Sequence, residues 1–254
     1  MIERFLDVAL TAREVGCRDL DGVGVVAVDI LRASTTITAA LGAGALGVWP
    51  VADPDRARCL GRRLGGLVGG EREGLPLPGF DLGNSPREYT REVVGGRPII
   101  LTTSNGTLTL VNARAAGWVV VGCFNNLGAV ASWVQRRSGG PVLIACAGTD
   151  GGERVSGEDL LFAGELVNLL TGRDRRRWHL REGALAAGEG ARNCRGPVKQ
   201  AVAEMPHARR LVRLGLGDDI AWAGEVDSSD TVGMMLEDSA GRPYVRATGD
   251  GSRG

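Results

Sequence analysis

This sequence of 254 residues has few histidines and no closely spaced pair of cysteines. Its two histidines, His179 and His207, follow none of the predicted strands, which argues against histidine phosphatase, Ser–His and histidine–metal sites. Five cysteines stand singly, without a CxxC pair, and this spacing disfavours a disulfide framework or a zinc knuckle. We therefore expect reduced thiols and a cytoplasmic protein.

Net charge and long apolar runs are also missing. Thirty basic and thirty acidic residues cancel, so no overall field attracts nucleic acid or an anionic membrane surface. Charges interrupt the N-terminal segment "MIERFLDVAL", and no apolar run reaches membrane-spanning length. We predict neither a nucleic-acid nor a membrane partner, and any anionic ligand needs a local site. The basic run "RDRRRWHLR" (173–181) is interpreted as a solvated loop or a subunit contact, which leaves a homodimer open.

Short apolar runs alternate with stretches of helical period over the first two thirds of the chain. This alternation predicts a mainly parallel sheet, mixed at one edge, in a three-layer α/β/α fold. We expect one domain over residues 1–247 and a disordered tail at 248–254. A helix is predicted over 198–215, and a hairpin of 230–236 with 242–248 is expected to close the sheet edge. The predicted strands are 24–30, 46–51, 66–70, 97–102, 117–122 and 141–147, and the predicted helices 35–43, 55–64, 107–115, 127–137 and 158–170.

Four of the predicted strands end in polar clusters. In an open parallel sheet, ligands bind outside the carboxyl ends of the strands, where loops lead into helix N-termini. Such clusters therefore mark the candidate site. They are "DILRAST" (29–35), "GGER" (69–72), "TSNGT" (103–107) and "GTDGGERVSGED" (148–159).

Two of the clusters suit the binding of an anion. Asp29 can sit at a strand end with Arg32 in the following turn, while Ser34 and Thr35 offer hydroxyls. The simpler interpretation is a helix capped by Ser34, with Asp29 and Arg32 paired. The segment 103–107 has the small hydroxyl, amide and glycine residues of anion-binding loops, although turn chemistry alone also explains it.

The other two clusters carry carboxylates. Glu71 and Arg72 leave an apolar run together, and a surface salt bridge is the usual role of such a pair. Glu158 and Asp159 lie in the first turn of a predicted helix. There the carboxylates interact favourably with the helix dipole, but they would also suit the binding of Mg²⁺. Cys146, between small residues, makes a thiol hydrolase a further alternative.

Taken together, the motifs resemble the 2-phosphosulfolactate phosphatase family over roughly residues 24 to 170. The resemblance implies an α/β phosphate monoesterase that depends on Mg²⁺. Its substrate would be a small anionic phosphorylated compound, 2-phospho-3-sulfolactate. The reaction would convert this compound to 3-sulfolactate and phosphate in the coenzyme M pathway. The motifs are "DILRASTT", "GGER", "DLGNSPREY", "TTSNGT", "ACAGT" and "SGEDLLFAGEL".

Residue roles follow from the resemblance together with the strand-end placement. The expected catalytic residues are Asp29, Arg32, Glu71 and Arg72, and the expected metal ligands are Asp29, Glu71, Glu158 and Asp159. The expected substrate-binding residues are Ser34, Thr35, Asn84, Ser85, Ser104, Asn105, Gly106, Thr107 and Thr149.

The attacking group is either water or Asp29 itself. Position 31 is leucine, whereas the aspartyl-phosphate phosphatases of the haloacid dehalogenase type carry a second carboxylate there. We therefore favour attack by water. A non-catalytic module that binds a phosphorylated metabolite through the same loops is the alternative to an enzyme.

Overall fold

The computed structural model describes residues 4–137, 139–172, 178–194 and 196–249. The basic positions 173–177 and the end of the predicted tail, 250–254, lie outside the described residues. The proposed division at residue 247 stays a prediction, as does the solvated loop or subunit contact expected for 173–177. Residues 178–180 of the same basic run form a strand, so the expected loop is wrong there.

The described residues form a mixed, mostly parallel sheet in the order β5-β4-β6-β3-β11-β10-β7-β2-β8-β1-β9. All six strands expected from the apolar runs are present, and β2 and β8 are buried along their whole length. The strands are β1 (Arg4–Ala9), β2 (Gly24–Val28), β3 (Gly47–Pro50), β4 (Leu67–Arg72), β5 (Leu75–Pro76), β6 (Pro98–Thr102), β7 (Trp118–Gly122), β8 (Val142–Cys146), β9 (Trp178–Leu180), β10 (Gly233–Glu237) and β11 (Pro243–Ala247).

The C-terminal hairpin lies in the middle of the sheet, so its expected place at an edge is wrong. Strand β10 pairs antiparallel with β7, and β11 pairs antiparallel with β3. The hairpin thus joins two parallel halves, β4-β6-β3 and β7-β2-β8-β1-β9. Each half would otherwise present an unpaired strand edge, and the hairpin supplies the missing backbone hydrogen bonds.

Helices cover both faces of the sheet, which confirms the three-layer α/β/α fold. Alternate residues of β2 face opposite cores, as strand geometry requires. Val26 and Val28 join a core with Phe162 of α7, whereas Val25 joins a second core with Ile37 of α2. The helices on these faces include α1 (Ala12–Gly16), α2 (Ala33–Gly42), α5 (Gly106–Asn112), α6 (Leu127–Arg136), α7 (Gly157–Gly172) and α8 (Glu182–Asn193).

One further helix and several short elements complete the fold. The helix α3 (Pro54–Leu64) begins at a side-chain cap from Asp53 and ends at Gly65 in the left-handed region (φ 61°), as its sequence favours. Further short elements are α4 (Arg91–Val94) and the 3-10 turns η1 (Pro86–Glu88), η2 (Ala113–Ala115) and η3 (Phe124–Asn126).

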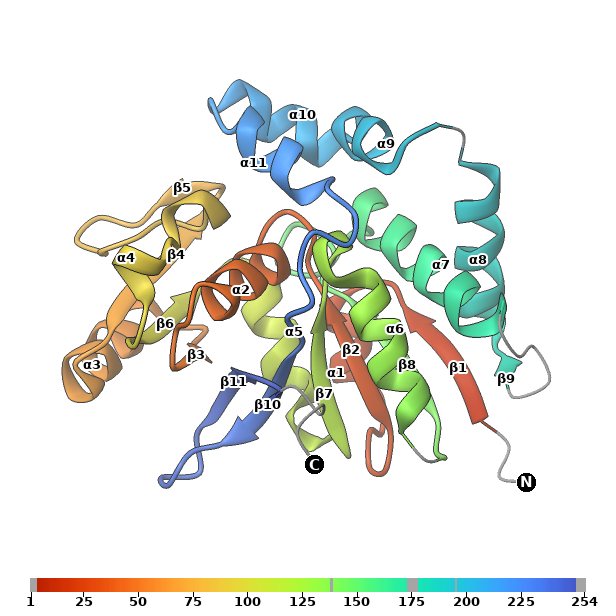
Figure 1. Ribbon diagram of the computed structural model, residues 1–254, viewed down its shortest axis with the longest axis horizontal. Helices are drawn as coiled ribbons and strands as arrows, with labels where there is room; N and C mark the ends of the chain where they lie inside the picture. Colours follow the sequence, from red (N-terminus) through yellow and green to blue (C-terminus); the bar gives the residue numbers. More distant parts are fainter. Residues whose placement is uncertain (1–3, 138, 173–177, 195, 250–254) are drawn as a thin grey trace.

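The helix predicted over 198–215 is two helices, α9 (Val198–Glu204) and α10 (Pro206–Arg213), followed by α11 (Gly217–Ala223). The break falls at Pro206, because proline lacks the N–H that a continuous helix needs and disfavours helical backbone in the residue before it. We name residues 198–223 the cap. Figure 1 shows the cap (blue) lying across the end of the sheet, above α2 and α7.

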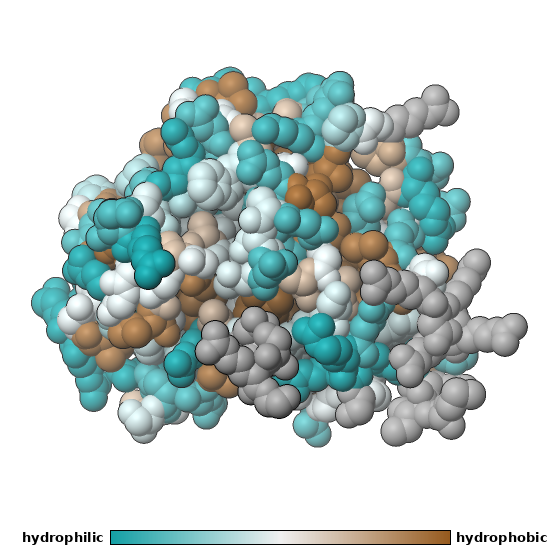
Figure 2. Space-filling view, viewed as in Figure 1, coloured by the Kyte–Doolittle hydropathy of each residue, from teal (hydrophilic) through white to brown (hydrophobic). Residues whose placement is uncertain are grey.

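Among the described residues, no helix combines the length and the apolar character needed to cross a membrane. Figure 2 shows mostly hydrophilic and neutral side chains on one face, with apolar patches scattered between them. The homodimer that the sequence leaves open stays a prediction.

Candidate active site

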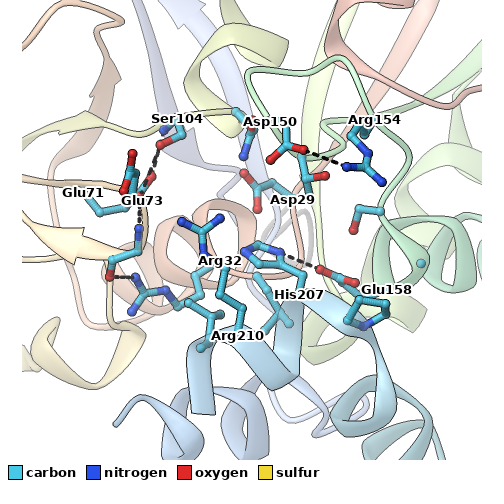
Figure 3. Close-up of a pocket in the computed structure, with 18 of the residues that line it drawn as sticks. Asp29, Arg32, Glu71, Glu73, Ser104, Asp150, Arg154, Glu158, His207 and Arg210 are labelled. Atoms are coloured by element: carbon cyan, nitrogen blue, oxygen red, sulfur yellow. Dashed lines mark hydrogen bonds and ion pairs between the residues drawn. The ribbon is translucent and has the colours of Figure 1, made fainter. Parts of the chain in front are cut away.

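A pocket of about 510 Å³ opens between the carboxyl ends of the strands and the cap (Figure 3). Loops after β2, β4, β6 and β8 line it, together with α10. These are the four strand ends that the sequence singled out. The expected site residues that line the pocket are Asp29, Arg32, Glu71, Asn84, Ser104, Asn105, Thr149 and Glu158.

Asp29 follows β2 and is almost fully buried. Its Oδ1 accepts a hydrogen bond from the Ala33 N–H at 3.3 Å. Gly106 makes room for it, because a Cβ there would lie 2.5 Å from Asp29 Oδ2 and from Ala33 Cβ. Burial raises the pKa of Asp29 to about 7, with the charges of Glu71 and Glu158 adding to the rise and His207 opposing it. A positive charge beside Asp29 would favour its anionic form.

Arg32 does not pair with Asp29, so the simpler interpretation of this turn is wrong. Its guanidinium donates to Asp219 Oδ2 and to the Gly74 carbonyl, each at 2.7 Å. The Ser85 hydroxyl donates to the other oxygen of Asp219 at 2.6 Å. Arg32 and Ser85 thus bind α11 of the cap to the strand-end loops, and Ser85 does not line the pocket.

The hydroxyls that follow Arg32 are also engaged within the protein. Arg32 occupies the N-cap position of α2, and Ser34 does not cap the helix as expected. Instead the Ser34 hydroxyl accepts from the Asp29 N–H at 2.8 Å, and the Thr35 hydroxyl donates to the Ile30 carbonyl at 2.8 Å. Neither side chain lines the pocket, so both support the turn that holds Asp29.

Glu71 and Arg72 point in different directions, as successive residues of a strand do. Glu71 lines the pocket and accepts from the Gly74 and Ser104 N–H groups at 2.7 and 2.8 Å. Arg72 does not line it, because its guanidinium donates to the carbonyls of Glu71 and Ala52 at 2.7 Å. The substrate clamp expected at Arg72 therefore stays a prediction that the observed direction of its side chain does not favour.

The segment after β6 is an internally bonded turn with one polar face on the pocket. Thr107 donates to the Thr103 carbonyl at 2.9 Å, and neither it nor Gly106 lines the pocket. Ser104 and Asn105 do, and the Asn105 side-chain oxygen accepts from the Gly152 N–H at 3.1 Å. Turn chemistry and a pocket-facing surface thus coexist in this segment.

Of the neighbouring residues Glu158 and Asp159, only Glu158 lines the pocket. Asp159 accepts from the Ile30 and Gly148 N–H groups at 2.9 and 3.1 Å and does not line the pocket. Burial, with the charges of Asp29 and Glu158, holds the pKa of Asp159 well above its ordinary value. Glu158 lines the pocket, and its buried Oε2 has no hydrogen-bond partner among the described residues.

His207 is the principal site residue that the sequence reasoning missed. It lies on α10 in the cap, lines the pocket, and its Nδ1 is 2.9 Å from Glu158 Oε1. Burial lowers the pKa of His207, but the hydrogen bond and charge of Glu158 outweigh this and leave the pKa raised. The signal available was the segment 205–210, in which a histidine precedes Arg210 by one helical turn on an amphipathic helix.

Cys146 ends β8, is 1% exposed and does not line the pocket. Burial raises the pKa of its thiol well above the ordinary value, with the charge of Asp159 adding to the rise. A buried, protonated thiol is a poor nucleophile. The geometry therefore opposes the cysteine hydrolase alternative.

Known proteins resemble this chain over most of its length. The family model of 2-phosphosulpholactate phosphatase matches residues 10–238. The chain belongs to this family. It is 38% identical to a probable 2-phosphosulfolactate phosphatase of Thermotoga petrophila over 223 residues, which cover 87% of this chain and 92% of the relative. It is 36% identical to a protein of the same description from Carboxydothermus hydrogenoformans over 216 residues, 85% and 87% of the two chains.

The family match reaches beyond the motifs that carried the resemblance. It includes the cap, and therefore His207 and Asp219, which lie after residue 170. The family match thus covers both the strand-end loops and the helices of the cap.

The magnesium expected from the family resemblance can be tested against the side chains present. Within the described residues, no three histidine, cysteine, aspartate or glutamate side chains converge as a ready-made cage. Mg²⁺ commonly needs only one or two carboxylates, with water and substrate phosphate completing the shell. Glu158 has an unpartnered oxygen, and Asp29 Oδ2 accepts no hydrogen bond from the described residues. These two carboxylates fit the ion, whereas Asp159 is already occupied by backbone N–H groups.

Proposed function

We propose that this protein hydrolyses the phosphate monoester of a small polyanionic 2-hydroxy acid, with 2-phospho-3-sulfolactate as the first candidate. One observation carries the proposal. Asp29, the segment after β6 and the His207–Glu158 pair line the same pocket, at the end of the sheet where α/β proteins bind their ligands. The names of the relatives supply the substrate class.

A divalent cation would balance the charge of this pocket. Asp29, Glu71, Glu73, Asp150 and Glu158 line it, against three arginines, of which Arg32 is neutralised by Asp219. A polyanionic substrate would meet a net negative lining, so binding without a cation is electrostatically unfavourable. We propose that Asp29 and Glu158 hold Mg²⁺. When bound, the ion would neutralise charge on the transferring phosphate oxygens.

The protein's own groups bind the substrate and move one proton. The polar side chains of Ser104, Asn105 and Asn84 face the pocket and are suited to binding substrate oxygens. Water attacks phosphorus, and the bond between phosphorus and the ester oxygen of the 2-hydroxy acid breaks. His207 gives a proton to that leaving oxygen and regains one from solvent after the reaction. One proton of the attacking water stays on its oxygen, and the other passes to a phosphate oxygen. Phosphoryl transfer needs little further covalent help from the protein.

Phosphate release tests this function. The purified protein with Mg²⁺ should release phosphate from 2-phospho-3-sulfolactate or a related phosphorylated 2-hydroxy acid, and Asp29→Asn should abolish the release. A wild-type protein that binds these compounds but releases no phosphate would contradict the proposal and favour the non-catalytic binding module.

Labelled water separates the two forms of attack. A single turnover in ¹⁸O-water should place the label in phosphate and none in the protein. Label in the Asp29 carboxyl group after digestion and mass analysis would instead indicate a covalent intermediate on Asp29.

A further inference from the structure

The three arginines that line the pocket differ in what holds them. Arg32 is buried and bonded to Asp219 and to a backbone carbonyl. Arg154 forms an ion pair with Asp150 at 3.5 Å, but both side chains are more than half exposed, so water screens this pair. Arg210 has no ion pair or hydrogen bond with any of the described residues.

The position of Arg210 is nevertheless fixed by its helix. Ala208 and Leu211 of α10 are fully buried in the core, which sets the rotation of this helix. Arg210 then follows His207 by three residues, so the two side chains lie on the same helix face and both line the pocket. Arg213, one turn further along, is exposed and does not line the pocket.

A cation at a pocket wall with no protein partner is available to a ligand. In the proposed mechanism His207 gives its proton to the ester oxygen, so Arg210, which lines the same pocket one helical turn away, would meet the part of the substrate beyond the ester bond. A guanidinium binds oxyanions through two N–H groups at once. Figure 3 shows that Arg154 and Arg210 come from different elements, the β8–α7 loop and α10, so they can approach a ligand separately.

We propose that Arg210 is a specificity residue that binds a second strong anionic group of the substrate, a sulfonate, on the carbon next to the phosphorylated one. This inference rests on the proposed phosphatase function. It predicts that the enzyme prefers phosphate esters bearing this extra charge over otherwise identical esters that lack it, and that Arg210 carries much of the preference.

The test compares two substrates in three proteins. The substrates are 2-phospho-3-sulfolactate and 2-phospholactate, which has a methyl group in place of the sulfonated carbon. The proteins are the wild type, Arg210→Gln and the matched control Arg213→Gln. We expect Arg210→Gln to lower kcat/KM for the sulfonated substrate about 10- to 100-fold more than for 2-phospholactate, as loss of a charged hydrogen bond predicts. Arg213→Gln should leave the ratio of the two at its wild-type value.

The outcomes distinguish this inference from the function beneath it. If Arg210→Gln leaves the ratio of the two kcat/KM values unchanged, whether or not both values fall, the specificity role would be overturned. The phosphatase function would stay in place. No phosphate release from either substrate by the wild type would overturn the proposed function and this inference with it. Partial recovery of the ratio in Arg210→Lys would support charge as the recognised property.

Discussion

One buried ion pair links α11 of the cap to the strand-end loops, and its loss should be measurable. Arg32 and Asp219 are 2.7 Å apart, with side chains only 3% and 2% exposed. Substituting Asp219→Asn leaves the Arg32 charge buried without a counter-charge, which costs about 3–5 kcal/mol. For a chain of this length each kcal/mol lowers Tm by about 2–4 °C, so we expect a fall of about 6–20 °C.

Thermal unfolding followed by circular dichroism measures this effect, and the neighbouring residue supplies a matched control. Asp218 pairs with Arg87 at the same distance, 2.7 Å, but these side chains are 75% and 52% exposed. An exposed pair contributes only about 0–1 kcal/mol, so Asp218→Asn should change Tm little. Similar shifts in the two variants would refute the reasoning. Replacing both buried partners, as in Arg32→Met with Asp219→Leu, should recover much of the lost stability.

Three further predictions concern the pocket. Gly106→Ala should strongly reduce turnover in the phosphate-release assay, because the added Cβ would lie 2.5 Å from Asp29 Oδ2. Gly190→Ala is the control: Gly190 has open space around it, so turnover in the same assay should stay unchanged. His207→Gln should lower kcat on the alkyl phosphate by about 10²–10⁴-fold but cost far less on p-nitrophenyl phosphate, whose leaving group needs no proton; equal losses on both substrates would contradict the proton-donor role. Cys146→Ala should keep most of the activity, and complete loss with an intact fold, judged by circular dichroism, would restore the cysteine hydrolase alternative.

The sequence predicted the strand-end half of the site because this half depends on patterns within short segments of the chain. Apolar runs rich in valine and isoleucine fix the parallel strands, and parallel strands bring their carboxyl ends to one edge. Asp29, Glu71 and Ser104 meet there for that reason. Side-chain direction was harder to predict, because Arg72 and Asp159 adjoin pocket residues but point into backbone contacts of their own.

The cap half of the site depends on contacts between distant segments. His207 is 49 residues from Glu158, and Asp219 is 187 residues from Arg32. No pattern within one helix indicates such partners, although Pro206 marks where the predicted long helix had to break. The hairpin is a similar case, since alternation indicates that β10 and β11 pair with each other but not which strands flank them.

Release of inorganic phosphate from 2-phospho-3-sulfolactate tests the central claim most directly. The wild-type protein with Mg²⁺ should release one phosphate for each 3-sulfolactate formed, and both Asp29→Asn and removal of divalent ions with a chelator should stop the reaction. Continued binding of the compound without phosphate release by the wild type in Mg²⁺ would contradict the account.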